Sequence, residues 1–170
     1  MRCFLAIDVS EELKPIIINL QKHIPKDAST IRPESFHFTL KFFRDVDPNM
    51  IIDKLSFLNN TEPFIIHLNG VGAFPSENPV KILWIGAESP NLIELQKSVT
   101  RVLGDTGDFV PHVTIARTKI HSSQLLTFVE KYRLFDAGKM RAECVKLKKS
   151  KLLPSGPVYT DIGKFRLRDE

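Results

Sequence analysis

Two short segments, Phe36-His37-Phe38-Thr39-Leu40 and Pro111-His112-Val113-Thr114-Ile115, repeat a His-x-Thr pattern close to half a chain apart in 170 residues. Each segment alternates as a β-strand does, so the histidine and the threonine share one face. The opposite faces are expected to carry Phe36, Phe38, Leu40 and Phe42 in the first strand and Val113 and Ile115 in the second. The repetition predicts an internal duplication whose pseudo-twofold symmetry brings both polar faces to one central cleft.

The repeated residues suit acid–base chemistry at phosphorus. An unperturbed histidine has a pKa of ~6.5, so near neutral pH one imidazole can be neutral while its partner is protonated. We predict that His37 and His112 divide the work, one taking a proton from an attacking water and the other protonating the leaving oxygen. The hydroxyls of Thr39 and Thr114 can donate hydrogen bonds to phosphate oxygens, where charge builds up in the transition state.

A metal site is the competing interpretation of the same residues. Zinc normally takes three or four protein ligands, and no Asp, Glu or Cys stands at matching positions beside His37 and His112. We therefore expect no metal and no cofactor. His23, His67 and His121 lack such companions and are interpreted as structural or surface residues. The chain also has no glycine-rich phosphate loop and no nucleophile elbow of the serine hydrolases.

The remaining sequence predicts a single α+β domain over residues 1–170, with no linker. Strands are expected at 1–9, 35–43, 64–71, 80–87, 109–117, 139–149 and 157–167. Helices are expected to follow Ser10, Asp47-Pro48, Ser89-Pro90 and Ser122 or Ser123. Pro15 lies awkwardly inside the first helix, whose regular part should therefore start later or kink. Several connections are too short for a helical crossover, which predicts antiparallel sheets.

The composition is that of a folded protein, with 42% hydrophobic and 26% charged residues. A net charge of +4 fits an anionic substrate. The basic run from Lys139 to Lys151 predicts either a solvated strand face or a phosphate-facing patch, and both remain open. Cys3 and Cys144 lack CxxC spacing, so reduced thiols in a cytoplasmic protein are expected. No stretch predicts a signal peptide or a membrane span.

With their flanking residues, 32–43 and 109–117 resemble the two signature motifs of the LigT-like RNA 2′,3′-cyclic phosphodiesterases. This family, historically called 2′-5′ RNA ligases, belongs to the two-histidine phosphoesterase superfamily. The resemblance runs nearly end to end: residues 2–8 are similar to its first strand, and residues 147–152 with 156–159 to its C-terminal signature. It implies a bilobal α+β fold, in which two similar antiparallel sheets backed by helices surround a central cleft.

The resemblance also implies the reaction and the role of each motif residue. The reaction is hydrolysis of a 2′,3′-cyclic phosphate on an RNA end to a 2′-phosphate, without a metal. His112 would be the base that activates water and His37 the acid. Thr39 and Thr114 would bind the phosphate.

Three further residues are candidates for contacts with RNA. The resemblance implies that Arg117 holds an RNA phosphate, but strict alternation puts it opposite His112, so the strand must end or bulge before it. Lys41 is expected to share the face of His37, where it would contact the RNA backbone or remain solvated. Phe4 would stack on a base or belong to the core.

Three functions remain open on the sequence alone. The chain is a hydrolase, an ATP-independent 2′-5′ ligase that joins 2′,3′-cyclic phosphate and 5′-hydroxyl ends such as tRNA halves, or a non-catalytic RNA-binding module. Microscopic reversibility assigns the first two to one site, so the sequence does not separate them. The presence of both histidines and both threonines argues against the third. We expect a monomer whose partner is RNA with 2′,3′-cyclic phosphate ends, among them tRNA fragments, and no membrane.

Overall fold

A computed structural model describes residues 1–104 and 107–168. Its strands are β1 (Cys3–Asp8), β2 (Ser29–Ile31), β3 (His37–Phe43), β4 (Phe64–Phe74), β5 (Ile82–Glu88), β6 (His112–Ile120), β7 (Asp136–Ala142), β8 (Cys144–Leu153) and β9 (Gly156–Arg166). Its helices are α1 (Lys14–Gln21), α2 (Pro48–Lys54), the 3₁₀ helix η1 (Ser56–Asn60), α3 (Pro90–Leu103) and α4 (Gln124–Lys131).

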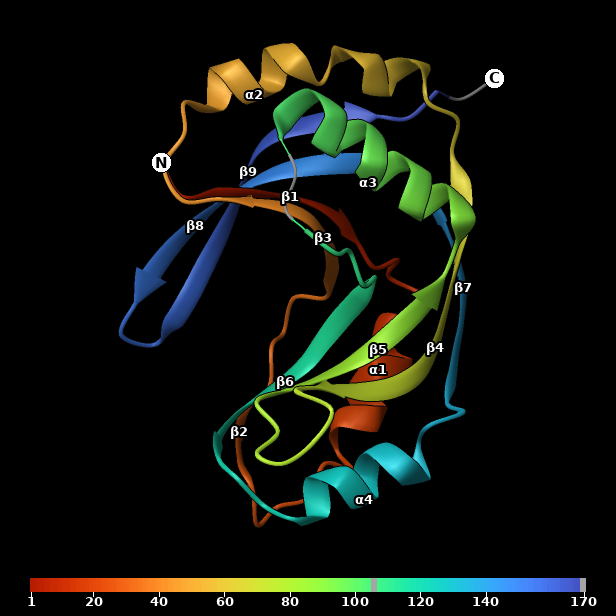
Figure 1. Ribbon diagram of the computed structural model, residues 1–170, viewed down its shortest axis with the longest axis vertical. Coiled ribbons are helices and arrows are strands. Elements are labelled where there is room, and N and C mark those ends of the chain that lie inside the picture. The colour runs from red at the N-terminus through yellow and green to blue at the C-terminus, as the bar shows by residue number, and fades with distance from the viewer. Residues whose placement is uncertain (105–106, 169–170) are drawn as a thin grey trace.

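All strands join one curled antiparallel sheet in the order β7-β4-β5-β6-β3-β1-β8-β9, with β2 paired to β6 (Figure 1). The motif strands β3 and β6 meet in the middle, where the register joins them only through Phe38 and Val113. The α+β class with antiparallel strands is therefore confirmed. The two expected sheets are the halves β7-β4-β5-β6 and β3-β1-β8-β9, which the narrow β3–β6 junction joins into one.

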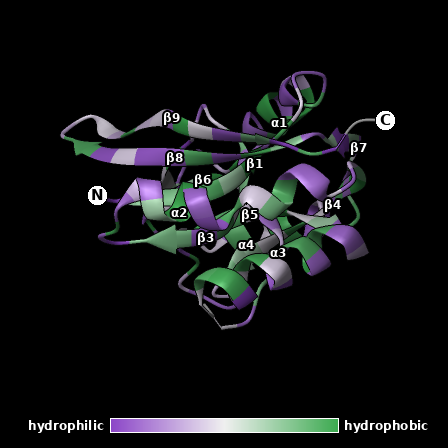
Figure 2. Cartoon of the chain, turned by 90° about the horizontal axis from the view of Figure 1, so that it is seen from above, coloured by the Kyte–Doolittle hydropathy of each residue, from purple (hydrophilic) through white to green (hydrophobic). Residues whose placement is uncertain are grey.

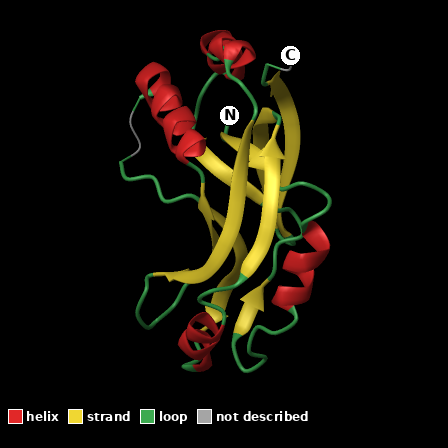
Figure 3. Ribbon diagram, turned by 90° about the vertical axis from the view of Figure 1, so that its right-hand side faces the viewer, coloured by secondary structure: helices red, strands yellow, loops and turns green. Residues whose placement is uncertain are grey.

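The helices lie around the outside of this central sheet, α2 and α3 beside the half with β3 and β1, and α1 and α4 beside the half with β4 and β5 (Figures 1 and 3). The helices bury apolar side chains against the sheet, among them Ile17 and Leu20 of α1 and Leu92 of α3, each no more than 2% exposed. One hydrophobic cluster includes residues of both halves, so the halves share a core. Phe38 and Val113 lie in it at 0% exposure.

The predicted helix starts at Asp47-Pro48 and Ser89-Pro90 agree with the observed ones, whereas the N-cap of α1 is Leu13 and not Ser10. The side chain of Asp47 accepts a hydrogen bond from the Asn49 amide, and the Ser89 hydroxyl accepts one from the Leu92 amide. Each of these caps is followed by a proline in the first helical turn. Helix α1 begins at Lys14 rather than after Ser10, as the position of Pro15 predicted. The longest helix, α3, has 14 residues, and no helix of the described ranges has the length and apolarity to cross a membrane.

The predicted strand over residues 139–149 is wrong. Strand β7 ends at Ala142 and β8 begins at Cys144, and these strands pair with β4 and β1 on opposite sides of the sheet. The buried positions change from Met140 and Ala142 in β7 to Val145 and Leu147 in β8, so the alternation shifts by one residue where the chain crosses from one half to the other. Strand β2 was not predicted. Figure 2 shows hydrophilic and hydrophobic residues mixed along the β8–β9 hairpin, which extends beyond the rest of the sheet.

Candidate active site

The two motifs lie side by side on the sheet face that points away from the core. His37 is the first residue of β3 and His112 the first of β6. These histidines, together with Thr39 and Thr114, are half-buried, whereas the residues between them are fully buried on the opposite face. The structure thus brings together the four residues that the sequence singled out.

A bulge follows the second motif. In the pairing of β6 with β5, Thr114 lies opposite Trp84 and Ala116 lies opposite Leu83, so Ile115 is an extra residue. An extra residue shifts the alternation of the strand by one position. Arg117 consequently lies on the face of Thr114 rather than on the opposite face. This is the bulge that a phosphate-binding role for Arg117 requires.

The first motif has a bulge at the equivalent place. In the pairing of β3 with β1, Thr39 lies opposite Ala6 and Lys41 lies opposite Leu5, so Leu40 is the extra residue. Both halves therefore contain a histidine, a threonine and a bulge at the same spacing. A single unaligned sequence gives no signal for such an extra residue.

The first bulge corrects the expected positions of Lys41 and Phe42. The Lys41 ammonium lies over the Phe43 ring, 5.4 Å from its centroid, and Phe43 packs against the core. Lys41 therefore lies on the face opposite His37. Phe42 takes the place equivalent to Arg117: it is 42% exposed and stacks on Phe4.

The Phe4 ring is only 2% exposed. A ring buried to this degree is not accessible for stacking on an RNA base, which was one of the two roles expected for Phe4. It lies under His37, at 5.1 Å between ring centroids, and under Tyr159, at 5.0 Å. Tyr159 contacts His37 edge to face at 5.6 Å. The Phe4 and Tyr159 rings thus both pack against the His37 imidazole. Phe4 is buried, whereas Tyr159 is half-exposed.

His112 is held by a hydrogen bond and by two rings. Its Nδ1 donates a hydrogen bond to the Val110 carbonyl at 2.8 Å, so Nε2 has no part in this bond. Phe74 meets the imidazole edge to face at 5.1 Å, and the Trp84 ring lies 6.4 Å away. Neither aromatic residue was among the candidates from the sequence.

Burial lowers the pKa of His37 to about 4. The positive charges of Lys148 and Arg117 and the neighbouring His112 contribute to this lowering, while Asp8 opposes it. The Nδ1 atom of His37 is buried and has no hydrogen-bond partner among the described residues. In the absence of an anion, His37 is therefore neutral at pH 7. The same positive potential attracts a phosphate group.

Beside His37 lies a quartet of charges formed by Lys146, Lys148, Asp8 and Asp161. Each lysine contacts both carboxylates at 2.8–3.2 Å. Burial alone would raise the pKa of Asp8 and of Asp161, but hydrogen bonds from the lysines outweigh it and hold both below their ordinary value. The quartet connects β8 with β1 and β9, and Asp8 is the register neighbour of His37.

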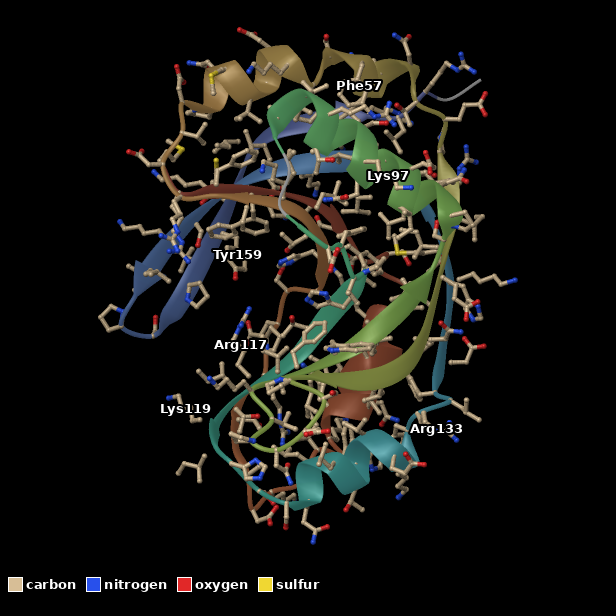
Figure 4. All side chains as sticks on the ribbon, viewed as in Figure 1. Phe57, Lys97, Arg117, Lys119, Arg133 and Tyr159 are labelled. Atoms are coloured by element: carbon tan, nitrogen blue, oxygen red, sulfur yellow. The ribbon has the colours of Figure 1, made fainter. Side chains whose placement is uncertain are left out.

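The basic run from Lys139 to Lys151 is therefore divided in the structure. Lys146 and Lys148 engage acids near the site, whereas Lys139 lies on β7 at the far end of the other half. Figure 4 shows Tyr159 of β9 and Arg117 of β6 on the same side of the molecule. Within residues 1–104 and 107–168, no group of three or more His, Cys, Asp or Glu side chains is arranged to hold a metal ion.

Comparisons with known proteins agree with this arrangement. The family model described as LigT-like phosphoesterase matches residues 7–84. An RNA 2′,3′-cyclic phosphodiesterase of Methanocaldococcus jannaschii is 36% identical over 97% of this chain and 100% of its own length. The enzyme of that name from Methanothermobacter thermautotrophicus is 34% identical, over 98% of this chain and 99% of its own.

Solved structures share the fold. A Thermus thermophilus protein superposes with a TM-score of 0.81 at 27% identity, covering 100% of both chains. The apo form of Escherichia coli LigT superposes with a TM-score of 0.79 at 21% identity, covering 99% of this chain and 98% of its own. Both His-x-Thr motifs lie within these matched ranges.

Proposed function

The chain belongs to the LigT-like RNA 2′,3′-cyclic phosphodiesterases, and we propose that it opens the cyclic phosphate with His37 and His112 as its acid–base pair. RNA is its substrate class. The observation that carries the proposal is the meeting of two His-x-Thr motifs on adjacent strands β3 and β6, on one face of the sheet. We further propose one catalytic domain, 1–170, built from two similar lobes that each supply one motif.

In the proposed reaction, a water attacks phosphorus as one imidazole takes its proton. The bond from phosphorus to the ribose 3′ oxygen breaks, and the other imidazole protonates that oxygen, leaving a 2′-phosphate. The hydroxyls of Thr39 and Thr114 donate hydrogen bonds to the non-bridging oxygens as their charge increases. Five-membered ring strain in the substrate favours opening without a metal ion.

The family resemblance assigns the base to His112 and the acid to His37. The hydrogen bond to Val110 suits the base role, because it orients His112 with Nε2 free. The acid role requires His37 to recover a proton when the substrate anion offsets the charges of Lys148 and Arg117. A p-nitrophenyl phosphodiester tests this assignment, because its leaving group needs no proton. We expect His37→Ala to retain activity on that ester and His112→Ala to lose it; the reverse result exchanges the roles.

Arg117 and Tyr159 are the proposed contacts for the RNA beyond the cyclic phosphate. Arg117 is exposed on the face of the motifs and its charge acts on His37, which supports binding of a neighbouring phosphate. Tyr159 offers an accessible ring beside His37, where the buried Phe4 does not. Lys41, on the opposite face, has no part in this proposal.

The proposed product is tested with a short RNA that carries a 2′,3′-cyclic phosphate end. We expect a 2′-phosphate, identified by ³¹P NMR, and a rate unchanged by excess EDTA. A 3′-phosphate product would contradict the proposed direction of opening. Activity that EDTA abolishes and zinc restores would contradict the metal-free mechanism.

Joining of RNA ends is the reverse of this reaction at the same site. We propose that hydrolysis dominates, with ends such as those of tRNA fragments as substrates and a monomer in the cytoplasm as the active form. The unpaired thiols of Cys3 and Cys144 support a reducing compartment. Measuring the rates of hydrolysis and of joining on a cleaved tRNA tests whether hydrolysis dominates. Joining that is faster than hydrolysis at cellular RNA concentrations would contradict this proposal.

A further inference from the structure

Asp8 is the residue directly opposite His37 on the neighbouring strand β1. Directly opposite residues of an antiparallel pair point to the same face of the sheet, with their Cβ atoms about 4.5–5.5 Å apart. The Asp8 carboxylate therefore lies on the face of the site, beside the imidazole proposed as the acid. In the other half, the residue opposite His112 on β5 is Gly86. The register thus places a carboxylate opposite one motif histidine and a glycine opposite the other.

Two ammonium groups hold the Asp8 carboxylate in place. The Nζ atom of Lys146 lies 2.8 Å from Oδ2 of Asp8, and that of Lys148 lies 3.0 Å from Oδ1. Both lysines also contact Asp161, so the quartet contains two positive and two negative charges. The Lys148 side chain is only 7% exposed, which shields these contacts from water. Asp8 is therefore fixed in position, and its negative charge is largely offset.

The balance of these charges acts on the His37 imidazole. The ring is half-buried, and its Nδ1 atom is buried without a hydrogen-bond partner among the described residues. Charges interact strongly where water is partly excluded. Burial disfavours the protonated ring, Lys148 adds to this effect, and Asp8 opposes it. Removing a negative or a positive charge from the quartet should therefore change the proton affinity of His37 in opposite directions.

Further ionisable groups lie around the same imidazole. They belong to the strands β9 and β6 and are Asp161, Tyr159, Arg117 and His112. Arg117 and His112 disfavour the protonated ring, as Lys148 does. Asp8 is the group that opposes them, and it does so from the adjacent strand.

We propose that Asp8 is a positioning residue that keeps on His37 the proton that this ring gives to the leaving oxygen. The inference rests on the proposed function and adds the group that prepares its acid. As the bond from phosphorus to the ribose 3′ oxygen breaks, His37 donates its proton to that oxygen and becomes neutral, and it takes a proton from solvent before the next turnover. Because Lys146 and Lys148 engage Asp8, the carboxylate does not pair so tightly with the imidazolium that the proton is retained.

Substitutions of opposite charge separate this role from a structural one. Asp8→Asn leaves two ammonium groups with one carboxylate and should lower the pKa of His37 below its wild-type value of about 4. Lys148→Met leaves one ammonium group with two carboxylates and should raise this pKa by about 1 or more. NMR titration of the His37 ring without substrate measures both changes. A purely structural role would not make the two variants differ in sign.

The same variants should change the pH dependence of kcat on an RNA with a 2′,3′-cyclic end. The basic limb of this profile reports the loss of the proton from the acid in the complex with substrate. The limb should move to lower pH in Asp8→Asn and to higher pH in Lys148→Met. At pH 7, Asp8→Asn should lower kcat about 10-fold or more, since a pKa lower by 1 reduces the protonated fraction tenfold. KM should change less than kcat, because the proposal places no substrate contact on Asp8.

The chain offers matched controls for these variants. Asp136→Asn removes the same charge from β7, the edge strand of the other half, and should leave the titration of His37 unchanged. Asp8→Glu keeps the carboxylate and should retain the wild-type pH profile. If Lys148→Met does not fold, Lys146→Met takes its place, because Lys146 contacts the same two carboxylates and its side chain is 22% exposed.

Equal His37 titration midpoints in the wild type, Asp8→Asn and Lys148→Met would overturn the inference, and so would shifts of the same sign. Opposite shifts with an unchanged pH profile of kcat would also overturn it, because the quartet would then have no part in the reaction. Failure of the proposed function is a separate result: a wild type that opens no cyclic phosphate refutes the reaction, whereas the titration still shows whether Asp8 controls the proton on His37.

Discussion

The two imidazoles of the site occupy unlike surroundings although their motifs repeat. His37 lies between the Phe4 and Tyr159 rings, and its Nδ1 has no hydrogen-bond partner among the described residues. His112 instead bonds the Val110 carbonyl. The symmetry of the fold therefore supplies two histidines, and the unrepeated residues around them give the two imidazoles different contacts.

Stability between pH 6.5 and pH 4 should depend on His37. In the unfolded chain this imidazole takes a proton near pH ~6.5, but in the folded protein it does so only near pH 4. The unfolded state thus binds more protons in this interval, and the free energy of unfolding falls as pH is lowered through it. Urea unfolding at several pH values should show this decline in the wild type and less of it in His37→Asn. Equal declines would contradict the lowered pKa.

Arg117 should contribute to RNA affinity through charge. We expect Arg117→Gln to weaken binding of an RNA with a cyclic end and to reduce the slope of log affinity against log salt by about 0.7 to 1, the loss of one phosphate contact. Arg133→Gln is the control, because Arg133 is exposed and pairs with Glu130 on α4, away from the site (Figure 4). Equal salt slopes in all three proteins would exclude the proposed contact.

At the scale of elements, the charge quartet of Lys146, Lys148, Asp8 and Asp161 holds the β8–β9 hairpin beside His37. Lys148 is 7% exposed at its side chain and contacts Asp8 of β1 and Asp161 of β9, so it links the three strands on the face of the site. This fastening places Tyr159 over Phe4 and His37. The hairpin thus acts on the site through one buried charge cluster and one ring.

Replacing the buried Lys148 should destabilise the protein, whereas replacing the exposed Lys149 should have little effect on stability. We expect Lys148→Met to lower the free energy of unfolding by about 1.5–3 kcal/mol, because it breaks charged hydrogen bonds and leaves Lys146 alone with two carboxylates. Lys149→Met, at the exposed next position, should change it by less than about 0.5 kcal/mol. Chemical denaturation compares the two, and similar losses would show that the quartet is not a stabilising cluster.

The elements were partly predictable from the sequence. The strands carrying the motifs follow from alternation, and the caps at Asp47 and Ser89 follow from side-chain chemistry before a proline. The break between β7 and β8 at Glu143 was not predicted, because the pairing of each strand depends on partner strands that are distant in the sequence. The bulges at Leu40 and Ile115 were not predictable for the same reason. The faces on which Lys41 and Phe42 lie were therefore predicted wrongly.

At the scale of the molecule, two four-strand halves meet at the pair Phe38 and Val113 and share one hydrophobic core. Each half presents its motif on the innermost strand, so joining the halves assembles the site. This meeting was predicted from the repeat alone. The aromatic and charged residues that differ between the halves were not predicted, because a repeat carries no information about what departs from it.

The rate of cyclic phosphate opening in a double-mutant cycle tests the acid–base pair most directly. General acid and general base steps are each worth about 10²–10⁴-fold, and groups that act as a unit are not additive. His37→Ala and His112→Ala should therefore each lower kcat at least about 100-fold on an RNA with a 2′,3′-cyclic end, with the double variant little slower than either. A folded single variant that keeps more than about a tenth of wild-type kcat would contradict catalysis by this pair.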